Sequence, residues 1–395
     1  MADRKVYRAS TTAPVNIAVI KYWGKRDSAL NLPTNSSLSV TLSQADLRTH
    51  TTASCSATFS SPDTLLLNSE SQDITTPRTS ACLSLLRASR KSLESADPSL
   101  PQLASLPLRL VSTNNFPTAA GLASSAAGFA ALVRAIANLY ELPLSATELS
   151  RIARQGSGSA CRSLMGGYVA WNMGSAADGS DSQAEQVAPA SHWPEMRALI
   201  LVVSAEKKGV SSTAGMQATV KTSTLFQARA SEVVPRRMEE MKRAVLDKDF
   251  EAFAKVTMKD SNNFHATCLD TDPPIFYLND VSRAAIRVVE SINERAGRVI
   301  AAYTFDAGPN AVIYYLQENE SEVAGVIKGH LGRMEGWEGH KGQQIRVAEE
   351  GGIDEKGLAT LKGGVSRIIL TGVGEDPRST EDHLIEEDGE PVKAS

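Results

Sequence analysis

An almost uninterrupted apolar helix is predicted over Ala119–Tyr140, where alanine is the commonest residue and only Arg134 and Asn138 interrupt the later turns. A helix that is apolar on nearly every side is buried over most of its surface. The chain must therefore supply other elements to surround this helix. Its 395 residues are enough for two domains, or for one large one.

The segments around this helix mix strand-like and helical patterns. We expect strands in Val15–Ile20, Ser37–Thr58, Leu106–Val111, Tyr168–Met173, Ala198–Val203, Val299–Thr304, Ala311–Tyr315 and Arg367–Leu370. Further helices are expected at Pro77–Leu93 and from Met216 to about Arg295. Because strands and helices follow one another without a regular βαβ order, the pattern predicts an α+β fold rather than a doubly wound sheet.

A composition typical of a linker occurs between Gly174 and Pro194, where Gly, Ser, Ala, Asp and Gln separate two apolar runs. We therefore predict an N-terminal domain at 1–190, a C-terminal domain at 191–373 and a tail at 374–395. The tail holds 8 acidic and 2 basic residues, which gives a net charge of −6. Such a charge run is expected to be a solvated, poorly ordered terminus.

Charge and cysteine content argue against several functional classes. The net charge of −4 lacks the basic excess that nucleic-acid binders usually show. The longest aliphatic run, Ala198–Val203, is far shorter than the ~20 residues of a membrane span. The first residues lack an apolar signal-peptide core, and the four cysteines form no CxxC pair, so we expect a cytoplasmic enzyme.

Common catalytic and metal-binding motifs are also missing from the sequence. No HExxH, GxSxG or paired-histidine spacing occurs, and no PLP or flavin site is indicated. His265 and Cys268 are expected to lie in the core face of a helix rather than at a metal ion.

Small residues run from Asn114 to Ala126, between a predicted strand and the alanine-rich helix. They let a ligand approach the backbone, and a helix N-terminus offers free N–H groups to an anion. The hydroxyls of Ser124 and Ser125 would add donors there, and a hydroxyl at this position can also bind Mg²⁺. This chemistry suits a nucleoside triphosphate, although no Walker GxxxxGK[ST] motif occurs. The alternative is a well-capped helix whose alanines allow close packing.

A second segment, Arg154–Ser163, places Ser157, Ser159 and Arg162 around two glycines. Hydroxyls, exposed N–H groups and one guanidinium can hold an anion, but GSGS runs are also common in ordinary loops. Cys161 has no histidine near it in the sequence and is expected to be a buried thiol rather than a nucleophile.

Three other segments could contribute charges to a site. Lys21–Arg26 carries three cations directly after a strand-like run. This segment could form an anion site, or it could be a solvated basic turn. Asp306 lies in Thr304–Asn310, beside Gly-Pro at a strand end, where it could face a cleft or only cap a turn. The small, polar and basic stretch Lys207–Met216 is typical of a mobile lid or of a linker.

Together these segments resemble the GHMP superfamily of small-molecule kinases. Pro117–Ala126 resembles its P-x-x-x-G-L-x-S-S-A phosphate loop, and within the superfamily the chain is similar to the eukaryotic mevalonate diphosphate decarboxylase family. Ala123 replaces a glycine that is common in the kinases, as it does in the decarboxylases. The similar blocks keep the family's order and are Ala13–Lys25, Asn31–Ser39, Asn114–Ala126, Gly156–Arg162 and Phe305–Asn310.

The resemblance implies two α/β sandwich domains, the first similar to ribosomal protein S5 domain 2, with the active site between them and a homodimeric assembly. It also implies an ATP-dependent decarboxylation of (R)-5-diphosphomevalonate to isopentenyl diphosphate in isoprenoid and sterol biosynthesis, with release of CO₂, ADP and phosphate. ATP would be the co-substrate and would carry Mg²⁺ with it, without PLP, thiamine or flavin. No nucleic acid or membrane would take part.

The resemblance further implies roles for individual residues. Asp306 would face the tertiary hydroxyl of the substrate as a base or orienting group. Arg162 would bind its anionic end and steer the carboxylate, with Lys21 assisting charge stabilisation, and Ser125 would contact the ATP phosphates. The implied substrate-binding positions are Tyr22, Trp23, Gly24, Lys25, Arg78, Ser157, Gly158, Ser159, Ala160, Cys161, Arg162, Ser212 and Thr213. The implied nucleotide-binding positions are Asn115, Pro117, Gly121, Leu122, Ala123, Ser124 and Ser125, and no residue is assigned to a metal.

Two other functions stay open at this point. A GHMP kinase would use the same phosphate loop and aspartate, but it would stop after phosphorylating its substrate. An RNA-binding domain of the ribosomal S5-like class would use the first half alone, and the net charge of −4 argues against it.

Overall fold

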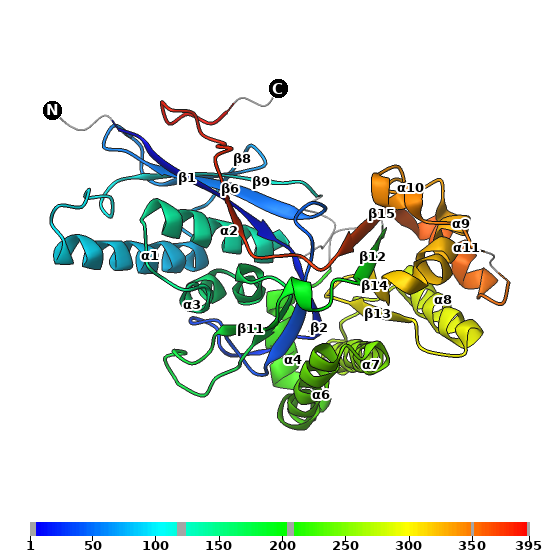
Figure 1. Ribbon diagram of the computed structural model, residues 1–395. Coiled ribbons are helices and arrows are strands. Elements are labelled where there is room, and N and C mark those ends of the chain that lie inside the picture. Colours follow the sequence, from blue (N-terminus) through cyan, green and yellow to red (C-terminus); the bar gives the residue numbers. More distant parts are fainter. Residues whose placement is uncertain (1–4, 117–123, 204–208, 349–350, 393–395) are drawn as a thin grey trace.

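The computed structural model describes residues 5–116, 124–203, 209–348 and 351–392, which form three larger sheets, one short hairpin and the helices around them (Figure 1). The first sheet has the order β16 (Arg378–Thr380), β1 (Tyr7–Pro14), β6 (Arg48–Cys55), β9 (Leu108–Asn114), β7 (Thr64–Leu67) and β8 (Glu70–Gln72). Its neighbours are antiparallel except for the parallel pair β7 and β9.

The alanine-rich helix α2 (Ser124–Leu139) packs against β1 and β6 of this sheet. Ala130, Ala131 and Ala135 are fully buried there in one apolar cluster, as the sequence predicted. Helix α1 (Pro77–Ala96) packs mainly on α3 (Ala146–Gly156), which contacts α2 in turn.

The second sheet has the order β11 (Ala184–Ala188), β10 (Tyr168–Trp171), β5 (Ser37–Thr41) and β2 (Asn16–Ile20). Every residue of its last three strands is buried, because protein covers both faces. The chain leaves β2 and enters a short hairpin of β3 (Lys25–Asp27) and β4 (Leu32–Pro33). The basic segment Lys21–Arg26 therefore begins at the end of a fully buried strand.

The third sheet is antiparallel and has the order β13 (Ala301–Phe305), β14 (Ala311–Leu316), β12 (Met196–Val203) and β15 (Val365–Gly372). The helices in this half are α4 (Ser212–Thr222), α5 (Leu225–Ala228), α6 (Val234–Asp247), α7 (Phe250–Leu269), α8 (Asp280–Ala296), α9 (Val326–Leu331), α10 (His340–Gln344) and α11 (Glu355–Gly364). Helix α8 begins at a capping box on Asn279 and ends at Gly297, whose φ of 65° suits glycine.

One continuous apolar core joins the two halves of the chain. It contains Ile17 and Val40 from the second sheet, Leu199 from the third sheet and Phe253 from α7. Strands β2 and β13 therefore end in a fixed relation to one another, and this relation positions the site described below.

The expected strands and helices are present, and the α+β class is confirmed. Strand β1 and helix α3 were not predicted. The division of the chain near residue 190 stays a prediction, because the shared core does not mark a boundary. None of the helices among the described residues is long and apolar enough to cross a membrane.

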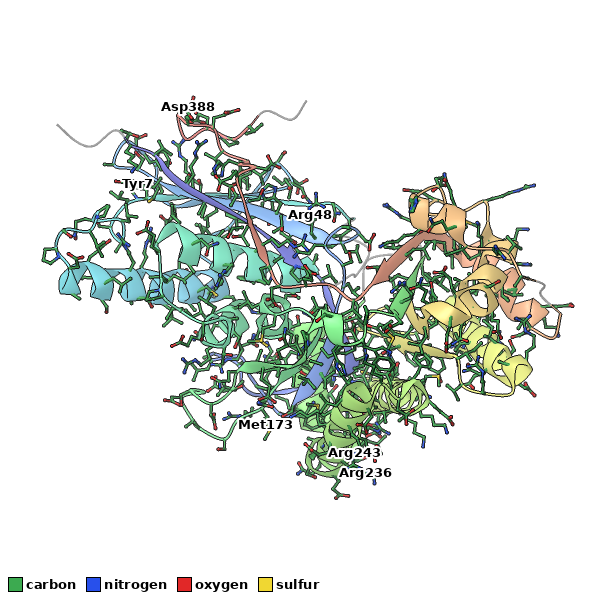
Figure 2. The ribbon with its side chains drawn as sticks, in the orientation of Figure 1. Tyr7, Arg48, Met173, Arg236, Arg243 and Asp388 are labelled. Carbon is green, nitrogen blue, oxygen red and sulfur yellow. The ribbon has the colours of Figure 1, made fainter. Side chains whose placement is uncertain are left out.

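The expectation of a poorly ordered acidic tail was wrong for residues 374–392. In Figure 1 the chain leaves β15 and crosses to the first sheet, where β16 pairs with β1. Figure 2 shows Asp388 of this segment beside the end of β1 that begins at Tyr7. Ile385 is fully buried, and Arg8 and Arg109 meet acidic side chains of the segment. Charge composition alone missed the buried isoleucine and the basic residues that receive the acidic ones.

Candidate active site

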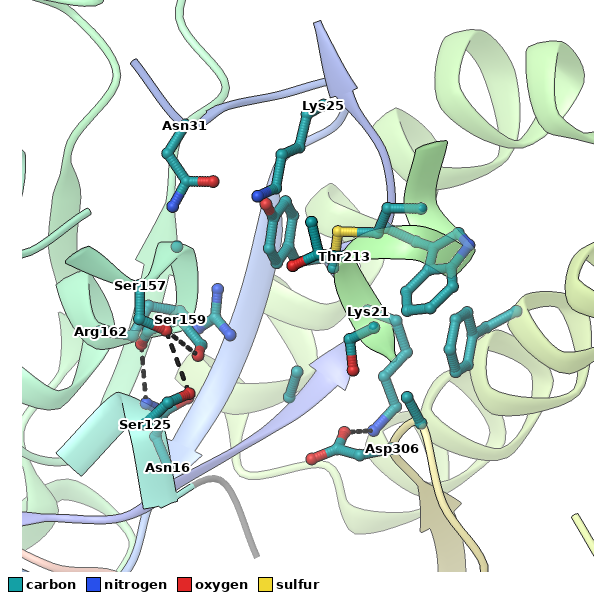
Figure 3. A pocket seen from close by; sticks show the side chains of 18 of the residues that line it. Asn16, Lys21, Lys25, Asn31, Ser125, Ser157, Ser159, Arg162, Thr213 and Asp306 are labelled. Carbon is teal, nitrogen blue, oxygen red and sulfur yellow. Dashed lines mark hydrogen bonds and ion pairs between the residues drawn. The ribbon is translucent and has the colours of Figure 1, made fainter. Parts of the chain in front are cut away.

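A pocket of about 540 Å³ opens where the end of β2, the start of α2, the 3₁₀ helix η2 (Gly158–Leu164) and the end of β13 meet (Figure 3). It brings together Lys21 and Asp306, which are 285 positions apart in the sequence. The predicted site residues that line it are Lys21, Tyr22, Trp23, Lys25, Arg78, Ser124, Ser125, Ser157, Gly158, Ser159, Arg162, Ser212, Thr213 and Asp306.

Hydroxyl groups cover the side of the pocket at the start of α2. Ser125 Oγ lies 3.3 Å from Ser157 Oγ, which in turn lies 3.4 Å from Ser159 Oγ. Hydroxyls and free N–H groups at the start of a helix are suited to phosphate oxygens. Four predicted nucleotide-binding residues, Pro117, Gly121, Leu122 and Ala123, lie outside the described residues.

Arg162 forms a fully buried cationic wall of the pocket. Its Nη1 donates to Ser37 Oγ at 2.6 Å, and its Nε donates to Ser39 Oγ at 3.1 Å. In the part of the chain that the structure describes, no carboxylate lies within ion-pair distance of this guanidinium. Burial lowers the pKa of Arg162 below its ordinary value, against the opposing charges around it. A bound anion would supply the missing countercharge.

Lys21 and Asp306 form an ion pair at the base of the pocket, with Lys21 Nζ 2.7 Å from Asp306 Oδ1. The lysine side chain is 3% exposed, whereas that of Asp306 is 35% exposed and reaches the pocket. Burial lowers the pKa of Lys21, while the carboxylate of Asp306 opposes that shift. The pair places one accessible carboxylate beside a cation that holds it in place.

Lys25 and Arg78 add two cations on the outer side of the pocket. Arg78 Nη2 donates to Thr213 Oγ1 at 2.8 Å and so links α1 to α4. Burial and the charge of Arg78 lower the pKa of Lys25 to about 8. With Lys21 and Arg162, the described lining holds four cations against the single carboxylate of Asp306. The pocket is therefore suited to a substrate with several negative charges.

Aromatic side chains shape the part of the pocket between these cations. The Tyr22 hydroxyl is buried and has no hydrogen-bond partner within the described residues. Trp23 donates from Nε1 to Thr219 Oγ1 at 3.0 Å and packs edge-on against Phe264. A Cβ on Gly24, whose φ is 90°, would lie 2.5 Å from Thr34 Oγ1, so only glycine fits this turn.

Several predicted residues do not line the pocket. Asn115 accepts from Arg48 N and donates to the Asp46 carbonyl, outside the pocket. Arg26 donates to the carbonyls of Met173 and Ala176. Ala160 and Cys161 are fully buried behind the lining, and burial raises the pKa of the Cys161 thiol to about 12. Cys161 is thus the buried thiol that the sequence predicted.

The pocket also contains residues that sequence reasoning missed. They are Asn16, Ala18, Asn31, Met216, Phe264 and Ala307. Asn16 Oδ1 is buried without a partner within the described residues, while its amide nitrogen donates to Ser159 O and Ser163 Oγ. The sequence could have pointed to Asn16 as a site residue, because it is the one polar residue in the apolar run Val15–Ile20.

The residue types of the site indicate anion chemistry. Within the described residues, no group of three or more His, Cys, Asp or Glu side chains could hold a metal ion. His265 and Cys268 lie buried in α7, as expected from the sequence. The site can bind phosphate groups, neutralise a carboxylate and hold a proton acceptor beside a hydroxyl.

Comparison with known proteins agrees with this geometry. The diphosphomevalonate decarboxylase-like N-terminal domain matches residues 13–184, and the mevalonate 5-diphosphate decarboxylase C-terminal domain matches residues 198–380. A diphosphomevalonate decarboxylase from Aspergillus fumigatus is 66% identical over 98% of each chain.

Solved structures give the same result. A crystal structure of mevalonate 5-diphosphate decarboxylase has a TM-score of 0.88 and 56% identity, and the match covers 96% of this chain and 98% of that one. A structure described as MDDEF in complex with MVAPP, AMPPCP and magnesium has a TM-score of 0.75 and 30% identity, over 95% of this chain and 100% of that one. The expected GHMP-superfamily fold is thereby confirmed. Sequence, fold and pocket together show that this chain belongs to the diphosphomevalonate decarboxylase family.

Proposed function

We propose that this protein is a carboxy-lyase that converts (R)-5-diphosphomevalonate and ATP to isopentenyl diphosphate, CO₂, ADP and phosphate. The observation that carries the proposal is the Lys21–Asp306 pair, 2.7 Å apart, at the base of a pocket whose other charged lining residues are cations. This arrangement suits a substrate that brings a diphosphate and a carboxylate and needs one hydroxyl activated.

The need for ATP follows from the electrons of the decarboxylation step. Breaking the carbon–carbon bond to the carboxylate of the substrate leaves an electron pair, which must move to an acceptor. Here the pair forms the new double bond and expels the oxygen on the neighbouring carbon. A hydroxyl leaves poorly, whereas a phosphate leaves readily, so ATP phosphorylates the tertiary hydroxyl first. Such a reaction needs no PLP, thiamine or flavin.

Asp306 is the residue that we assign to the tertiary hydroxyl. Its partly exposed carboxylate can accept the hydroxyl proton or orient the hydroxyl toward the transferred phosphate. The Lys21 ammonium, 2.7 Å away, holds that carboxylate in position and adds positive charge where the phosphate and the carboxylate gather.

The substrate's anionic groups are assigned to the remaining cations. Arg162 would bind the carboxylate, because its guanidinium is held by two hydroxyls and has no described carboxylate partner. The cations Lys25 and Arg78 would contact the diphosphate, together with the Tyr22 hydroxyl, which has no hydrogen-bond partner among the described residues. The hydroxyls of Ser157, Ser159 and Thr213 lie on the same lining.

The nucleotide is assigned to the start of α2, where Ser124 and Ser125 line the pocket. The described lining offers one carboxylate and several hydroxyls, which fits Mg²⁺ bound mainly by the triphosphate and not by an all-protein cage. The metal would neutralise phosphate charge during transfer. The structure described as MDDEF, which holds MVAPP, AMPPCP and magnesium, supports the use of a nucleotide and Mg²⁺.

The decisive experiment follows both products from one reaction. Incubation with ATP and diphosphomevalonate should release CO₂ and inorganic phosphate in a one-to-one ratio, and omission of either substrate should abolish both. A phosphorylated acid that accumulates without CO₂ would identify a GHMP kinase instead.

We also propose that the protein works in the cytoplasm as a homodimer. Relatives of this family support the assignment to a biosynthetic enzyme, and sedimentation of the purified chain would decide its oligomeric state. A single species at the 42.2 kDa of one chain would contradict the dimer.

A further inference from the structure

Two adjacent residues of α7 accept hydrogen bonds from the backbone of the two segments that carry Lys21 and Asp306. Asp260 Oδ2 accepts a hydrogen bond from the Lys21 N–H at 2.8 Å. Ser261 Oγ accepts one from the N–H of Phe305, the residue before Asp306, at 3.2 Å. Asp260 and Ser261 are both fully buried, and neither lines the pocket. One rigid helix thus contacts both segments that carry the ion pair.

The Lys21 peptide is held from its carbonyl side as well. Arg229 Nη2 donates to the Lys21 carbonyl at 3.2 Å, and Asn35 Nδ2 donates to the same oxygen at 3.0 Å. Arg229 also binds both oxygens of Asp260, at 3.0 and 3.1 Å. The backbone of Lys21 is therefore fixed at its N–H and at its carbonyl by one buried charge pair.

Asp260 is well suited to this task because it remains ionised despite its burial. Burial opposes the charge, but Arg229, the Lys21 N–H and Arg237 outweigh that effect, so the pKa of the Asp260 carboxyl lies below its ordinary value. Arg237 Nη1 lies 3.1 Å from Oδ1. A carboxylate with four donors around it cannot shift without breaking several charge-assisted hydrogen bonds.

We propose that Asp260 and Ser261 are positioning residues that fix the separation of the Lys21 ammonium and the Asp306 carboxylate through the backbone N–H groups of Lys21 and Phe305. The inference rests on the proposed function, since it assigns a role in that reaction. A small misplacement of reacting groups lowers the reaction rate strongly. The hydrogen bonds of Asp260 and Ser261, called anchors below, come from successive residues of one helix and prevent such a misplacement. The two residues lie outside the pocket lining, so their effect should appear in kcat rather than in substrate affinity.

Ser261→Ala removes the hydrogen bond to the Phe305 N–H and changes the size of the side chain only slightly. We expect its kcat to fall about 10-fold, with the KM values for ATP and diphosphomevalonate unchanged. Ser150→Ala is the matched control, because Ser150 is also fully buried and its Oγ also accepts a strand N–H, from Ala184 at 2.9 Å. Ser150 lies outside the pocket lining, so this control should lose thermal stability to a similar extent while keeping its kcat.

Asp260→Asn tests the charge of the other anchor. Asparagine keeps an acceptor for the Lys21 N–H but leaves Arg229 and Arg237 without a countercharge, which lowers the pKa of Lys21 further. We expect kcat to fall about 100-fold and the alkaline limb of its pH profile to move toward lower pH. The charged and titratable groups around Lys21 are Asp306 and Arg162 on the pocket side and Asp260, Arg229 and His265 behind it.

The outcomes separate this inference from the proposed function. A wild-type protein that releases no CO₂ contradicts the function itself. An active wild type in which Ser261→Ala matches Ser150→Ala in kcat overturns the positioning role. The positioning role is overturned as well if Asp260→Asn folds and keeps the kcat of the wild type. If Asp260→Asn does not fold, the comparison of the two serine variants decides.

Discussion

Two buried arginines, Arg162 in the pocket lining and Arg229 outside it, lie near Lys21 and are used in opposite ways. Arg229 binds both oxygens of Asp260, so its charge is neutralised inside the protein. Arg162 is equally buried, but hydroxyls of Ser37 and Ser39 hold it. A guanidinium held by a carboxylate supports structure, whereas one held by neutral groups retains a net charge that a ligand can neutralise.

The difference also concerns the stability of the empty protein. Burying a charge without a countercharge is costly, and the lowered pKa of Arg162 reflects its burial. Removing one partner of a buried ion pair is costly for the same reason, because it leaves the other charge alone. Removing the charge of Arg162 should therefore cost activity but not stability, whereas removing a charge from the Arg229–Asp260 pair should lower stability as well as activity.

The largest effect is expected for Asp306→Asn, which removes the carboxylate on the pocket side. Losing a positioned base costs about 10² to 10⁴ in rate, so kcat should fall by that range. Affinities for ATP and diphosphomevalonate should change little, since cations and hydroxyls bind the phosphates. Single-turnover rates, nucleotide affinity and melting temperature measured on this variant test the assignment. A destabilised but active enzyme would show that Asp306 only caps a turn.

The next prediction compares substitutions of the two arginines directly. Arg229→Met leaves Asp260 with Arg237 as its one described ion-pair partner and should lower the free energy of unfolding by about 3–5 kcal/mol. Arg162→Met removes a charge without a described carboxylate partner and should raise the free energy of unfolding by about 1 kcal/mol, while it lowers activity. Denaturant unfolding of both variants measures the difference. Equal destabilisation would mean that the two arginines have the same structural role.

Arg162→Lys keeps the charge on the pocket side but changes its shape. A guanidinium binds a carboxylate through two parallel hydrogen bonds, which an ammonium cannot reproduce. We expect kcat/KM for diphosphomevalonate to fall about 100-fold, with KM for ATP nearly unchanged. Steady-state kinetics would decide, and near-normal activity would indicate that a diffuse positive field is sufficient.

The smallest effect concerns the pH dependence of substrate capture. Burial and the charge of Arg78 lower the pKa of Lys25 to about 8, so Lys25 loses its charge as the pH rises through that value. Its attraction for the diphosphate should fall with it, and kcat/KM should be about 10-fold lower at pH 9 than at pH 7. Lys25→Arg stays charged over this range and should move the fall to higher pH. An unchanged profile would exclude Lys25 as its source.

Sequence patterns predicted many of the elements and several segments of the pocket, because both depend on local signals, whereas Arg78 and Thr213 were named through the family resemblance alone. The apolar run of α2 and the hydroxyl, cation and carboxylate segments each lie within a short stretch of chain. The anchors on α7 were not predictable in this way. Asp260 acquires its role only when α7 packs against β2, and nothing near Ser261 in the sequence points to Phe305. The sequence around Arg229 likewise does not indicate that its partner is Asp260.

The pairing of β16 with β1 has a consequence for biosynthesis. Strand β1 begins at residue 7 and β16 at residue 378, so a ribosome makes the outer neighbour of β1 long after β1 itself. At about 5–20 residues per second, this delay lasts roughly 20 to 75 seconds. Throughout that time the outer edge of β1 keeps unpaired N–H and carbonyl groups, which can pair with other strands. Chaperones that cover exposed strand edges should therefore act on the nascent chain of this protein until its last segment is released.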